Sequence, residues 1–143
     1  MSHIAYLSLG TNLGDKQHNL ESAIVEIAKR VGVVQATSAF MVTEPWGFES
    51  KHSFLNAAVR VLTELSPLDL LHVTQQIERK LGRSRKSVDG RYHDRIIDID
   101  IMLYDNIELH TPNLTIPHAH LHERDFMLTP LKEILISNEY NLR

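Results

Sequence analysis

The stretch Arg95-Ile96-Ile97-Asp98-Ile99-Asp100-Ile101-Met102-Leu103-Tyr104 alternates apolar and acidic side chains, a pattern typical of a β-strand. Alternate side chains of a strand share a face, so one face is expected to point into a core: Ile97, Ile99, Ile101 and Leu103. Asp98 and Asp100 are then expected on the other face, about 7 Å apart along the strand. Two such carboxylates repel each other unless a positive group lies beside them, and a divalent cation is the simplest candidate. The alternative is a solvent-facing strand whose aspartates form salt bridges with nearby arginines.

The composition limits the class of protein. The chain has 143 residues, enough for one domain with a real core, and we expect residues 1–143 to form that single domain. The 15 Lys and Arg against 18 Asp and Glu give a formal net charge of −3, which argues against nucleic acid held by bulk charge. The chain has no cysteine, no signal-like start and no membrane-spanning apolar run. We therefore expect a cytoplasmic monomer with no nucleic-acid or membrane partner.

The hydrophobic pattern before this stretch predicts alternating strands and helices. The expected elements are a strand over 4–9, a helix through 20–31, strands over 33–43 and 54–63, a helix over 67–81 and the strand over 95–104. The run over 54–63 could also be a helix, but its β-branched content favours a strand. The order βαββαβ predicts an α+β, ferredoxin-like fold, with helices on one face of an antiparallel sheet and the other face left for ligands or added elements.

A C-terminal extension is expected to follow this unit. Residues 107–109 and 114–116 could form a small hairpin, which Pro117 ends. A last helix is expected over 123–136, interrupted or kinked near Pro130 because proline cannot donate a helical hydrogen bond.

The candidate chemistry is concentrated around the second helix and the last strand. Glu78 lies near the end of that helix, where the macrodipole disfavours a negative charge. The chain then crowds basic residues into one segment: Arg79, Lys80, Arg83, Arg85, Lys86, Arg91 and Arg95. Carboxylates that hold a metal and arginines that contact phosphate oxygens would together form a site for a metal-bound polyphosphate. A solvated charge run is the alternative, and no glycine-rich phosphate loop is present.

Two further groups of residues are candidates for ligand binding. His118, His120 and His122 would share a face if the chain were extended, which could form a transition-metal site, although a polar rim is the simpler interpretation. Trp46, Phe54 and Phe126 could be ordinary core residues or could enclose a flat ring. Asn56 has both donor and acceptor groups with which to contact the edge of such a ring.

Several motifs in order resemble those of the 6-hydroxymethyl-7,8-dihydropterin pyrophosphokinase family. They are Gly10-Thr11-Asn12-Leu13-Gly14, Phe54-Leu55-Asn56-Ala57-Ala58, Gln76-Ile77-Glu78, Gly82-Arg83-Ser84-Arg85, Arg95-Ile96-Ile97-Asp98-Ile99-Asp100-Ile101, Pro117-His118 and Arg124-Asp125-Phe126-Met127-Leu128. The resemblance extends from the first strand to about Leu131. It implies transfer of pyrophosphate from ATP to the hydroxymethyl group of the pterin, with release of AMP, in folate biosynthesis.

The resemblance also implies roles for individual residues. Asp98 and Asp100 match the ligands of two Mg²⁺ ions that bridge the ATP phosphates. The residues expected at ATP are Arg83, Arg85, Arg95, His118 and Arg124, and Arg83 and Arg95 are expected to act in catalysis with the two aspartates. The residues expected at the pterin are Thr43, Trp46, Phe54, Asn56, Glu78 and Phe126, with a supporting role for Glu78.

The chain departs from the family pattern at four positions. Phe54 stands where many relatives have tyrosine, Tyr92 replaces a common tryptophan, and His93-Asp94 replaces a Gly-Pro pair. Two other functions remain open at this stage. One is nucleotidyl transfer or cyclisation, which would attack the α-phosphorus and release pyrophosphate. The other is a binding or regulatory module of the same fold without chemistry.

Overall fold

The computed structural model describes residues 1–44, 53–82 and 96–136. The elements in these ranges are β1 (His3–Thr11), α1 (Lys16–Arg30), β2 (Gly32–Thr37), β3 (Met41–Thr43), β4 (Phe54–Thr63), α2 (Pro67–Gly82), β5 (Asp98–Tyr104), β6 (Leu109–His110), β7 (Thr115–Ile116) and α3 (Asp125–Ile134).

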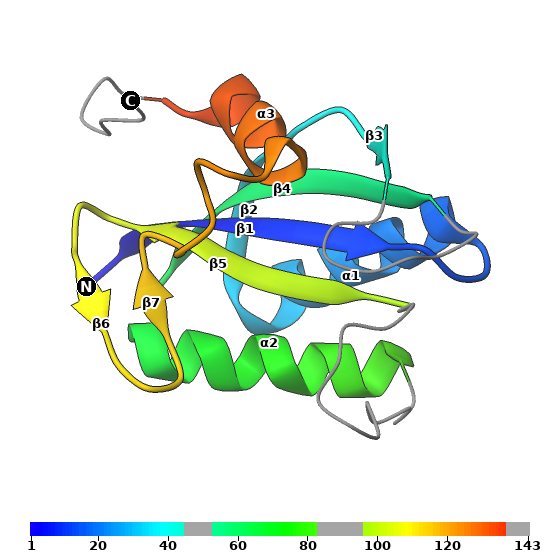
Figure 1. The fold of residues 1–143 in the computed structure, drawn as a ribbon. Coiled ribbons are helices and arrows are strands. Elements are labelled where there is room, and N and C mark those ends of the chain that lie inside the picture. The colour runs from blue at the N-terminus through cyan, green and yellow to red at the C-terminus, as the bar shows by residue number, and fades with distance from the viewer. Residues whose placement is uncertain (45–52, 83–95, 137–143) are drawn as a thin grey trace.

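The main sheet is antiparallel and has the strand order β2-β4-β1-β5, with β3 also paired to β4. The first and last strands of the βαββαβ unit, β1 and β5, are neighbours in this order, and β1 lies between β4 and β5 (Figure 1). The predicted ferredoxin-like arrangement is therefore confirmed. The assignment of residues 54–63 to a strand rather than a helix is confirmed as well.

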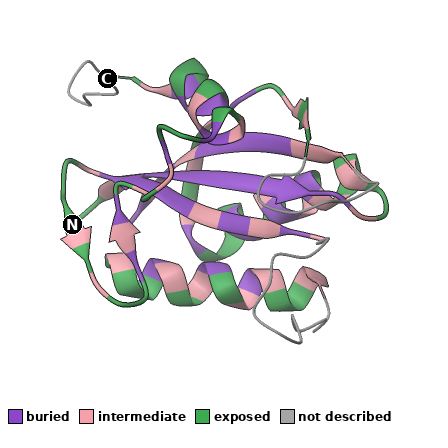
Figure 2. Cartoon of the chain, viewed as in Figure 1, coloured by how far each residue is buried: buried purple, intermediate pink, exposed green. Residues whose placement is uncertain are grey.

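Helices cover both faces of the sheet, and each face has its own core (Figures 1 and 2). α1 and α2 contribute Leu20, Ile27 and Ile77 to a first core, which includes Ile97, Ile99 and Ile101 of the last strand and its approach. α3 lies on the opposite face and contributes the apolar side chains of a second core: Met127, Leu131 and Ile134. The added C-terminal helix thus occupies part of the face that the sequence left for ligands or added elements.

The two helices of the first face begin at side-chain caps. The Asp15 carboxylate accepts a hydrogen bond from the backbone N–H of His18 (3.2 Å), and the Ser66 hydroxyl accepts one from the N–H of Asp69 (3.2 Å). Pro67 at the first position of α2 has no N–H to satisfy and has a backbone angle that suits a helix.

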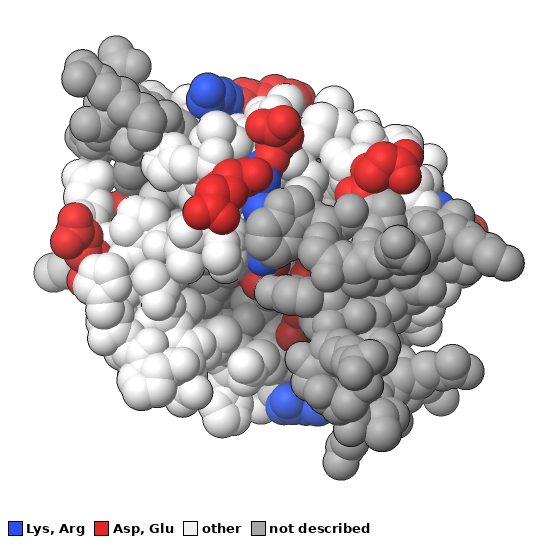
Figure 3. Space-filling model, in the orientation of Figure 1, with Lys and Arg blue, Asp and Glu red and all other residues white. Residues whose placement is uncertain are grey.

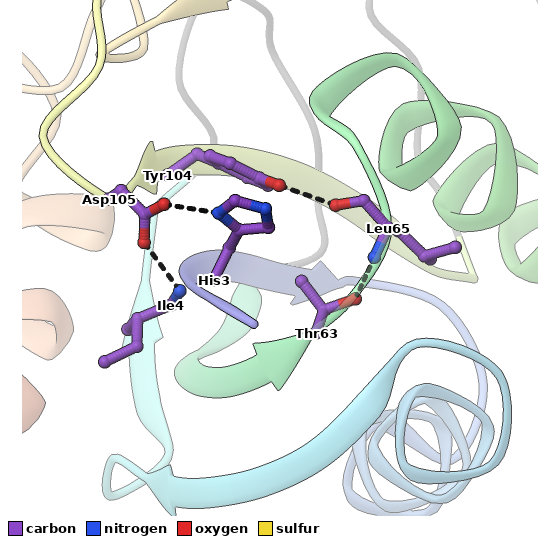
Figure 4. A network of polar contacts seen from close by, with 6 residues as sticks. All are labelled: His3, Ile4, Thr63, Leu65, Tyr104 and Asp105. Carbon is purple, nitrogen blue, oxygen red and sulfur yellow. Dashed lines mark hydrogen bonds and ion pairs between the residues drawn. The ribbon is translucent and has the colours of Figure 1, made fainter. Parts of the chain in front are cut away.

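The N-terminal end of β1 is fixed by Asp105, which follows β5 (Figure 4). Its carboxylate accepts a hydrogen bond from the N–H of Ile4 (2.8 Å) and pairs with Nδ1 of His3 (2.6 Å). The hydroxyl of Tyr104 donates to the carbonyl oxygen of Leu65 (2.6 Å). These contacts tie both ends of the βαββαβ unit to the chain that leads into α2.

The single strand predicted over 33–43 is wrong, because this segment forms β2 and β3 with a break between them. At the break, Ser38 pairs with Ala58 of β4. The hydroxyl of Ser38 accepts the hydrogen bond from the Ala58 N–H (2.8 Å), while the Ser38 N–H donates to the Ala58 carbonyl oxygen (2.9 Å). A side chain thus replaces a backbone carbonyl in the ladder and interrupts the strand.

The predicted position of Leu103 is also wrong, because it joins Met102 in the second core rather than the isoleucines in the first. Tyr6 of β1 lies opposite Leu103 and Leu7 lies opposite Ile101, so Met102 is an extra residue in the ladder. Such a β-bulge reverses the alternation beyond it. The strand itself begins at Asp98 rather than at Arg95, which lies outside the described residues.

The C-terminal elements follow the prediction with different bounds. β6 and β7 form the expected hairpin, with Leu109 opposite Ile116. The last helix is shorter than predicted and continues through Pro130, which therefore does not interrupt it. Pro130 is one of the buried residues of α3, together with Met127, Leu131 and Ile134.

Candidate active site

The two predicted carboxylates lie at the start of β5, the edge strand of the sheet. Asp98 and Asp100 are two residues apart on one strand, so their side chains share a face. Asp98 lies opposite Gly10 of β1, and Asp100 lies opposite Ser8. Both aspartates are partly exposed, and the Asp100 side chain retains 31% of its accessible surface. The pair lies on the face that carries α3, beyond the second core.

Glu78 of α2 reaches the same strand from the other face. Its Oε2 accepts a hydrogen bond from the backbone N–H of Ile99 (2.8 Å), a group at the free edge of β5. Burial of Glu78 and the negative charge of Asp98 raise its pKa to about 8, and a hydrogen bond with Asp98 and the charge of Asp100 act in the same direction. The Ile99 hydrogen bond opposes this shift only in part. Without a cation, this group of three carboxyl groups therefore retains a proton near neutral pH.

His118 completes the acidic end of the site. Its Nε2 lies 3.8 Å from Oδ1 of Asp100, and its Nδ1 accepts a hydrogen bond from the backbone N–H of His120 (3.1 Å). The Nδ1 contact places the ring proton on Nε2, toward Asp100. Burial and the positive charge of Arg124 lower the pKa of His118 to about 4, so the ring is neutral at physiological pH.

Three of the residues expected at the pterin lie on the neighbouring strands β3 and β4: Thr43, Phe54 and Asn56. Glu78, which was also expected there, instead lies beside Asp98. Nδ2 of Asn56 donates a hydrogen bond to the hydroxyl oxygen of Thr43 (2.5 Å), and the carbonyl oxygen of Met41 lies 3.5 Å away. Thr43 lies opposite Phe54 in the β3–β4 pair. Asn56 is fully buried, while Phe54 is half-buried, so the amide is held rigidly beside a partly accessible ring. The amide oxygen of Asn56 is a hydrogen-bond acceptor.

Arg124 and Phe126 approach this face from the start of α3. The Arg124 guanidinium carbon lies 5.5 Å from the centre of the Phe126 ring, a cation–π distance. Arg124 is buried, and Phe126 packs against the edge of the second core while remaining half-buried. The charge of Arg124 also lowers the pKa of His118, so the start of α3 lies close to the acidic end of the site.

Small residues of β1 join the two parts of the site, a feature that the sequence interpretation missed. Gly10 lies opposite Asn56 on one side and opposite Asp98 on the other. Ser8 lies in the same way between Ala58 and Asp100. The strand predicted over 4–9 ends before Gly10, whereas the structure places Gly10 inside β1. In the sequence, the Gly10-Thr11-Asn12 motif was the only sign that this glycine is important. The register of β1 with its two neighbours shows that it lies between Asn56 and Asp98.

Four of the predicted site residues lie outside the described residues: Trp46, Arg83, Arg85 and Arg95. Of the others, the structure groups Asp98, Asp100, Glu78 and His118 at one end. It groups Thr43, Phe54 and Asn56 at the other end, with Arg124 and Phe126 on α3.

The donor set of the acidic end fits a magnesium–nucleotide complex better than a metal held by protein alone. Within the described ranges, no group of three or more histidine or acidic side chains is arranged to hold a metal ion. Magnesium is commonly bound by one or two carboxylates, with phosphate oxygens and water completing its shell. Asp98 and Asp100, partly exposed and on one face, match that requirement.

The three histidines considered as a transition-metal site do not form one. The segment that contains them forms turns rather than an extended chain, so the expected common face is absent. His118 lies near Asp100, whereas Nδ1 of His120 lies 2.9 Å from a carboxylate oxygen of Glu123. The rings of His118 and His120 are tilted, with centres 6.0 Å apart.

The charged side chains of the described residues can be followed over one face of the molecule. The face in Figure 3 shows acidic and basic side chains in separate small groups, and the described residues form no continuous basic surface there. None of the helices in the described ranges is long and apolar enough to cross a membrane.

Comparison with known proteins gives one consistent result. A sequence model of the 7,8-dihydro-6-hydroxymethylpterin-pyrophosphokinase (HPPK) family matches residues 6–136. A Porphyromonas gingivalis protein named 2-amino-4-hydroxy-6-hydroxymethyldihydropteridine pyrophosphokinase is 51% identical over 132 residues, 92% of this chain and 90% of the relative. The Bacillus subtilis protein of that name is 41% identical over 135 residues, 94% of this chain and 79% of the relative.

A solved structure confirms the fold. The crystal structure of Plasmodium falciparum HPPK-DHPS superposes with a TM-score of 0.73 at 18% identity, over 99% of this chain. At 18% identity the similarity concerns the fold alone, and this chain spans 43% of that longer protein.

Proposed function

This chain belongs to the 7,8-dihydro-6-hydroxymethylpterin-pyrophosphokinase family, and from that membership we propose how its residues carry out the reaction. It is a pyrophosphokinase of folate biosynthesis, which transfers pyrophosphate from ATP to 6-hydroxymethyl-7,8-dihydropterin and leaves AMP. The observation that carries the proposal is the register of β1. It places Asn56 and Asp98 on either side of Gly10, so a ring at one end and a polyphosphate at the other end would meet over β1.

We assign the acidic end to ATP. Asp98 and Asp100 would hold Mg²⁺ together with phosphate oxygens of ATP, as two carboxylates on one face permit. His118, whose Nε2 lies 3.8 Å from Oδ1 of Asp100, and Arg124, whose charge acts on His118, would contact the phosphates from the α3 side. Glu78 supports the pair, because its bond to the Ile99 N–H fixes the edge of β5 between the two aspartates. Arg83, Arg85 and Arg95 remain assigned to the phosphates by the family motifs.

We assign the other end to the pterin. Asn56 has its NH₂ group committed to Thr43, which leaves its carbonyl oxygen to accept from an N–H group at the edge of the ring. Phe54 and Phe126 are half-buried aromatic side chains on two different elements, and both can stack on a flat ring. Trp46 keeps its assignment to the pterin from the sequence.

In the reaction, the hydroxyl oxygen of the pterin forms a bond to the β-phosphorus of ATP. The bond from that phosphorus to the oxygen shared with the α-phosphorus breaks, AMP leaves with this oxygen, and the hydroxyl proton is released. Bound magnesium would neutralise the phosphate charge that opposes this attack. The role of the protein is to hold the alcohol and the phosphorus in line, which the rigid central strand of the sheet favours.

The test is product analysis with ATP, Mg²⁺ and 6-hydroxymethyl-7,8-dihydropterin. The wild-type protein is expected to form AMP and the pterin pyrophosphate in equal amounts. Pyrophosphate as the product would instead indicate nucleotidyl transfer, and binding without turnover would indicate a module without chemistry. ADP would contradict all three assignments.

Asp98→Asn and Asp100→Asn test the assignment of the acidic end. Each is expected to lower kcat by at least about a thousandfold, because phosphoryl transfer depends on charge neutralisation at the phosphates. Circular dichroism is expected to show an intact fold, since both side chains are partly exposed. Asp69→Asn, at an exposed position on α2, is the matched control and keeps wild-type activity. Unchanged kcat in either site variant contradicts the assignment.

A further inference from the structure

We infer that Gly10 is a positioning residue for the acceptor, and that its missing side chain keeps the Asn56 amide and the Phe54 ring in place beside the path to the phosphates. The inference rests on the proposed function, because it takes Asn56 and Phe54 to be the pterin end of the site. It goes beyond that function by assigning a role to a residue without a side chain.

The first step of the argument is the backbone of Gly10. Gly14 is the glycine of the described residues with a left-handed backbone (φ 70°), and Gly10 does not share this conformation. An alanine could therefore adopt the Gly10 backbone without strain. Glycine also weakens the interior of a strand, because it loses more conformational freedom on folding and packs no side chain. Backbone geometry thus gives no reason for a glycine in the central strand.

The second step is the space around Gly10. A Cβ atom built there would lie 3.0 Å from Oδ1 of Asn56, and 3.5 Å and 3.9 Å from two ring carbons of Phe54. These are the three nearest heavy atoms, and all belong to the pterin end of the site. The contact with Oδ1 is tighter than a normal carbon–oxygen contact, so Asn56 would have to move.

The third step is that Asn56 cannot move freely. It is 1% exposed, and its NH₂ group is bound to the hydroxyl of Thr43 at 2.5 Å. A shift of the amide by a few tenths of an ångström would either lengthen this hydrogen bond or displace the carbonyl oxygen that is expected to accept from the ring. A methyl group at Gly10 is therefore expected to weaken binding of the acceptor.

The fourth step is the position of Gly10 between the two ends. Neighbouring strands are about 4.8 Å apart, so the backbones at Asn56 and Asp98 are separated by about 10 Å with Gly10 midway. An acceptor ring at Asn56 must direct its hydroxymethyl arm across β1 to reach a phosphorus near Asp98. A glycine at this point lets the arm lie close to the backbone.

The experiment compares Gly10→Ala with wild type in the assay of AMP formation. Gly10→Ala is expected to raise the KM for the pterin by about tenfold or more and to change the KM for ATP by less than about twofold. Val33→Ala, which shortens an exposed side chain of β2 outside the proposed site, is the control and is expected to match wild type. An unchanged pterin KM in a folded Gly10→Ala protein overturns the inference, as does an equal rise in both KM values.

A double-mutant cycle with Asn56→Ala separates positioning from a general loss of stability. Because Oδ1 is absent in Asn56→Ala, adding Gly10→Ala to it is expected to raise the pterin Kd by less than about threefold. If Gly10→Ala alone is too unstable to assay, the double variant must recover the fold. An equally unstable double variant, or fully additive effects, overturns the inference. A wild-type protein that forms no AMP would instead refute the proposed function, so the two failures are distinguishable.

Discussion

Glu78→Gln is expected to change how the stability of the protein depends on pH. The side chain has an ordinary pKa of 4.5 in the unfolded chain and a pKa raised to about 8 in the folded protein, chiefly by burial and by the charge of Asp98. Between these two values the folded state holds a proton that the unfolded state has released. The free energy of unfolding therefore falls as the pH rises through this range, with a slope of at most about 1.4 kcal/mol per pH unit.

The substitution removes this dependence with little change in geometry. Glutamine is neutral at every pH, keeps an oxygen that can accept from the Ile99 N–H, and offers an NH₂ group to Asp98. The difference in unfolding free energy between Glu78→Gln and wild type should therefore grow in favour of the variant from pH 5 to pH 8, by up to about 3 kcal/mol. Asp98→Asn removes the largest charge that raises the Glu78 pKa, so it should reduce the same dependence in part.

The measurement is urea unfolding followed by far-ultraviolet circular dichroism at several pH values, at constant ionic strength and with EDTA so that no divalent cation neutralises the carboxylates. Glu64→Gln, at an exposed position after β4, is the matched control and should leave the wild-type profile unchanged. Parallel profiles for wild type and Glu78→Gln would refute the argument, because they would mean that Glu78 binds no more protons in the folded state than in the unfolded chain.

Three other predictions concern single contacts. In Asp105→Gly the new glycine tolerates the left-handed backbone at this position (φ 48°), but the hydrogen bonds to His3 and Ile4 are lost. The substitution should lower the free energy of unfolding in urea by about 1–3 kcal/mol, and an unchanged unfolding midpoint would contradict this role. Lys80→Met removes the 2.7 Å partner whose hydrogen bond lowers the pKa of Glu26. The variant should therefore be less stable than wild type near neutral pH, and the difference should fade as the pH drops and Glu26 is protonated; a pH-independent difference would argue against it. His118→Gln should leave the shape of the kcat profile above about pH 5 unchanged, because the histidine pKa of about 4 keeps the ring neutral there; loss of a limb near pH 6 to 7 would show that His118 titrates in that range.

The sequence predicted the strand, helix and hairpin order because that order depends on local periodicity and caps. The buried stripe of α1, the Ser66 cap of α2 and the alternation around Ile99 are all visible within one segment. The features it missed depend on a second segment. The break at Ser38 exists because its hydroxyl replaces a carbonyl opposite Ala58, and the position of Leu103 depends on how β5 pairs with β1.

In the site, too, features carried by one segment could be predicted, whereas features that depend on a second segment could not. Asp98 and Asp100 were recognisable as a pair because one strand carries both, whereas Glu78 was recognisable only as an acid at an unfavourable helix end. Its bond to the Ile99 N–H requires α2 to lie along the edge of β5, and the raised pKa follows from that packing. The motif that contains Gly10 was visible in the sequence, but its position between Asn56 and Asp98 was not, because that position depends on two other strands.

The site is also where the chain departs from the rules that stabilise the rest of the sheet. A glycine occupies the central strand, two aspartates begin an edge strand, and a carboxyl group and an imidazole are partly buried with strongly shifted pKa values. Each feature lowers stability in the free protein, and the four lie close together around β1 and the start of β5. Such a concentration is expected where a ligand supplies the missing partners. A ring beside Asn56 would fill the space over Gly10, and a metal-bound polyphosphate would neutralise Asp98 and Asp100. The features that lower the stability of the free sheet would thus become contacts in the substrate complex.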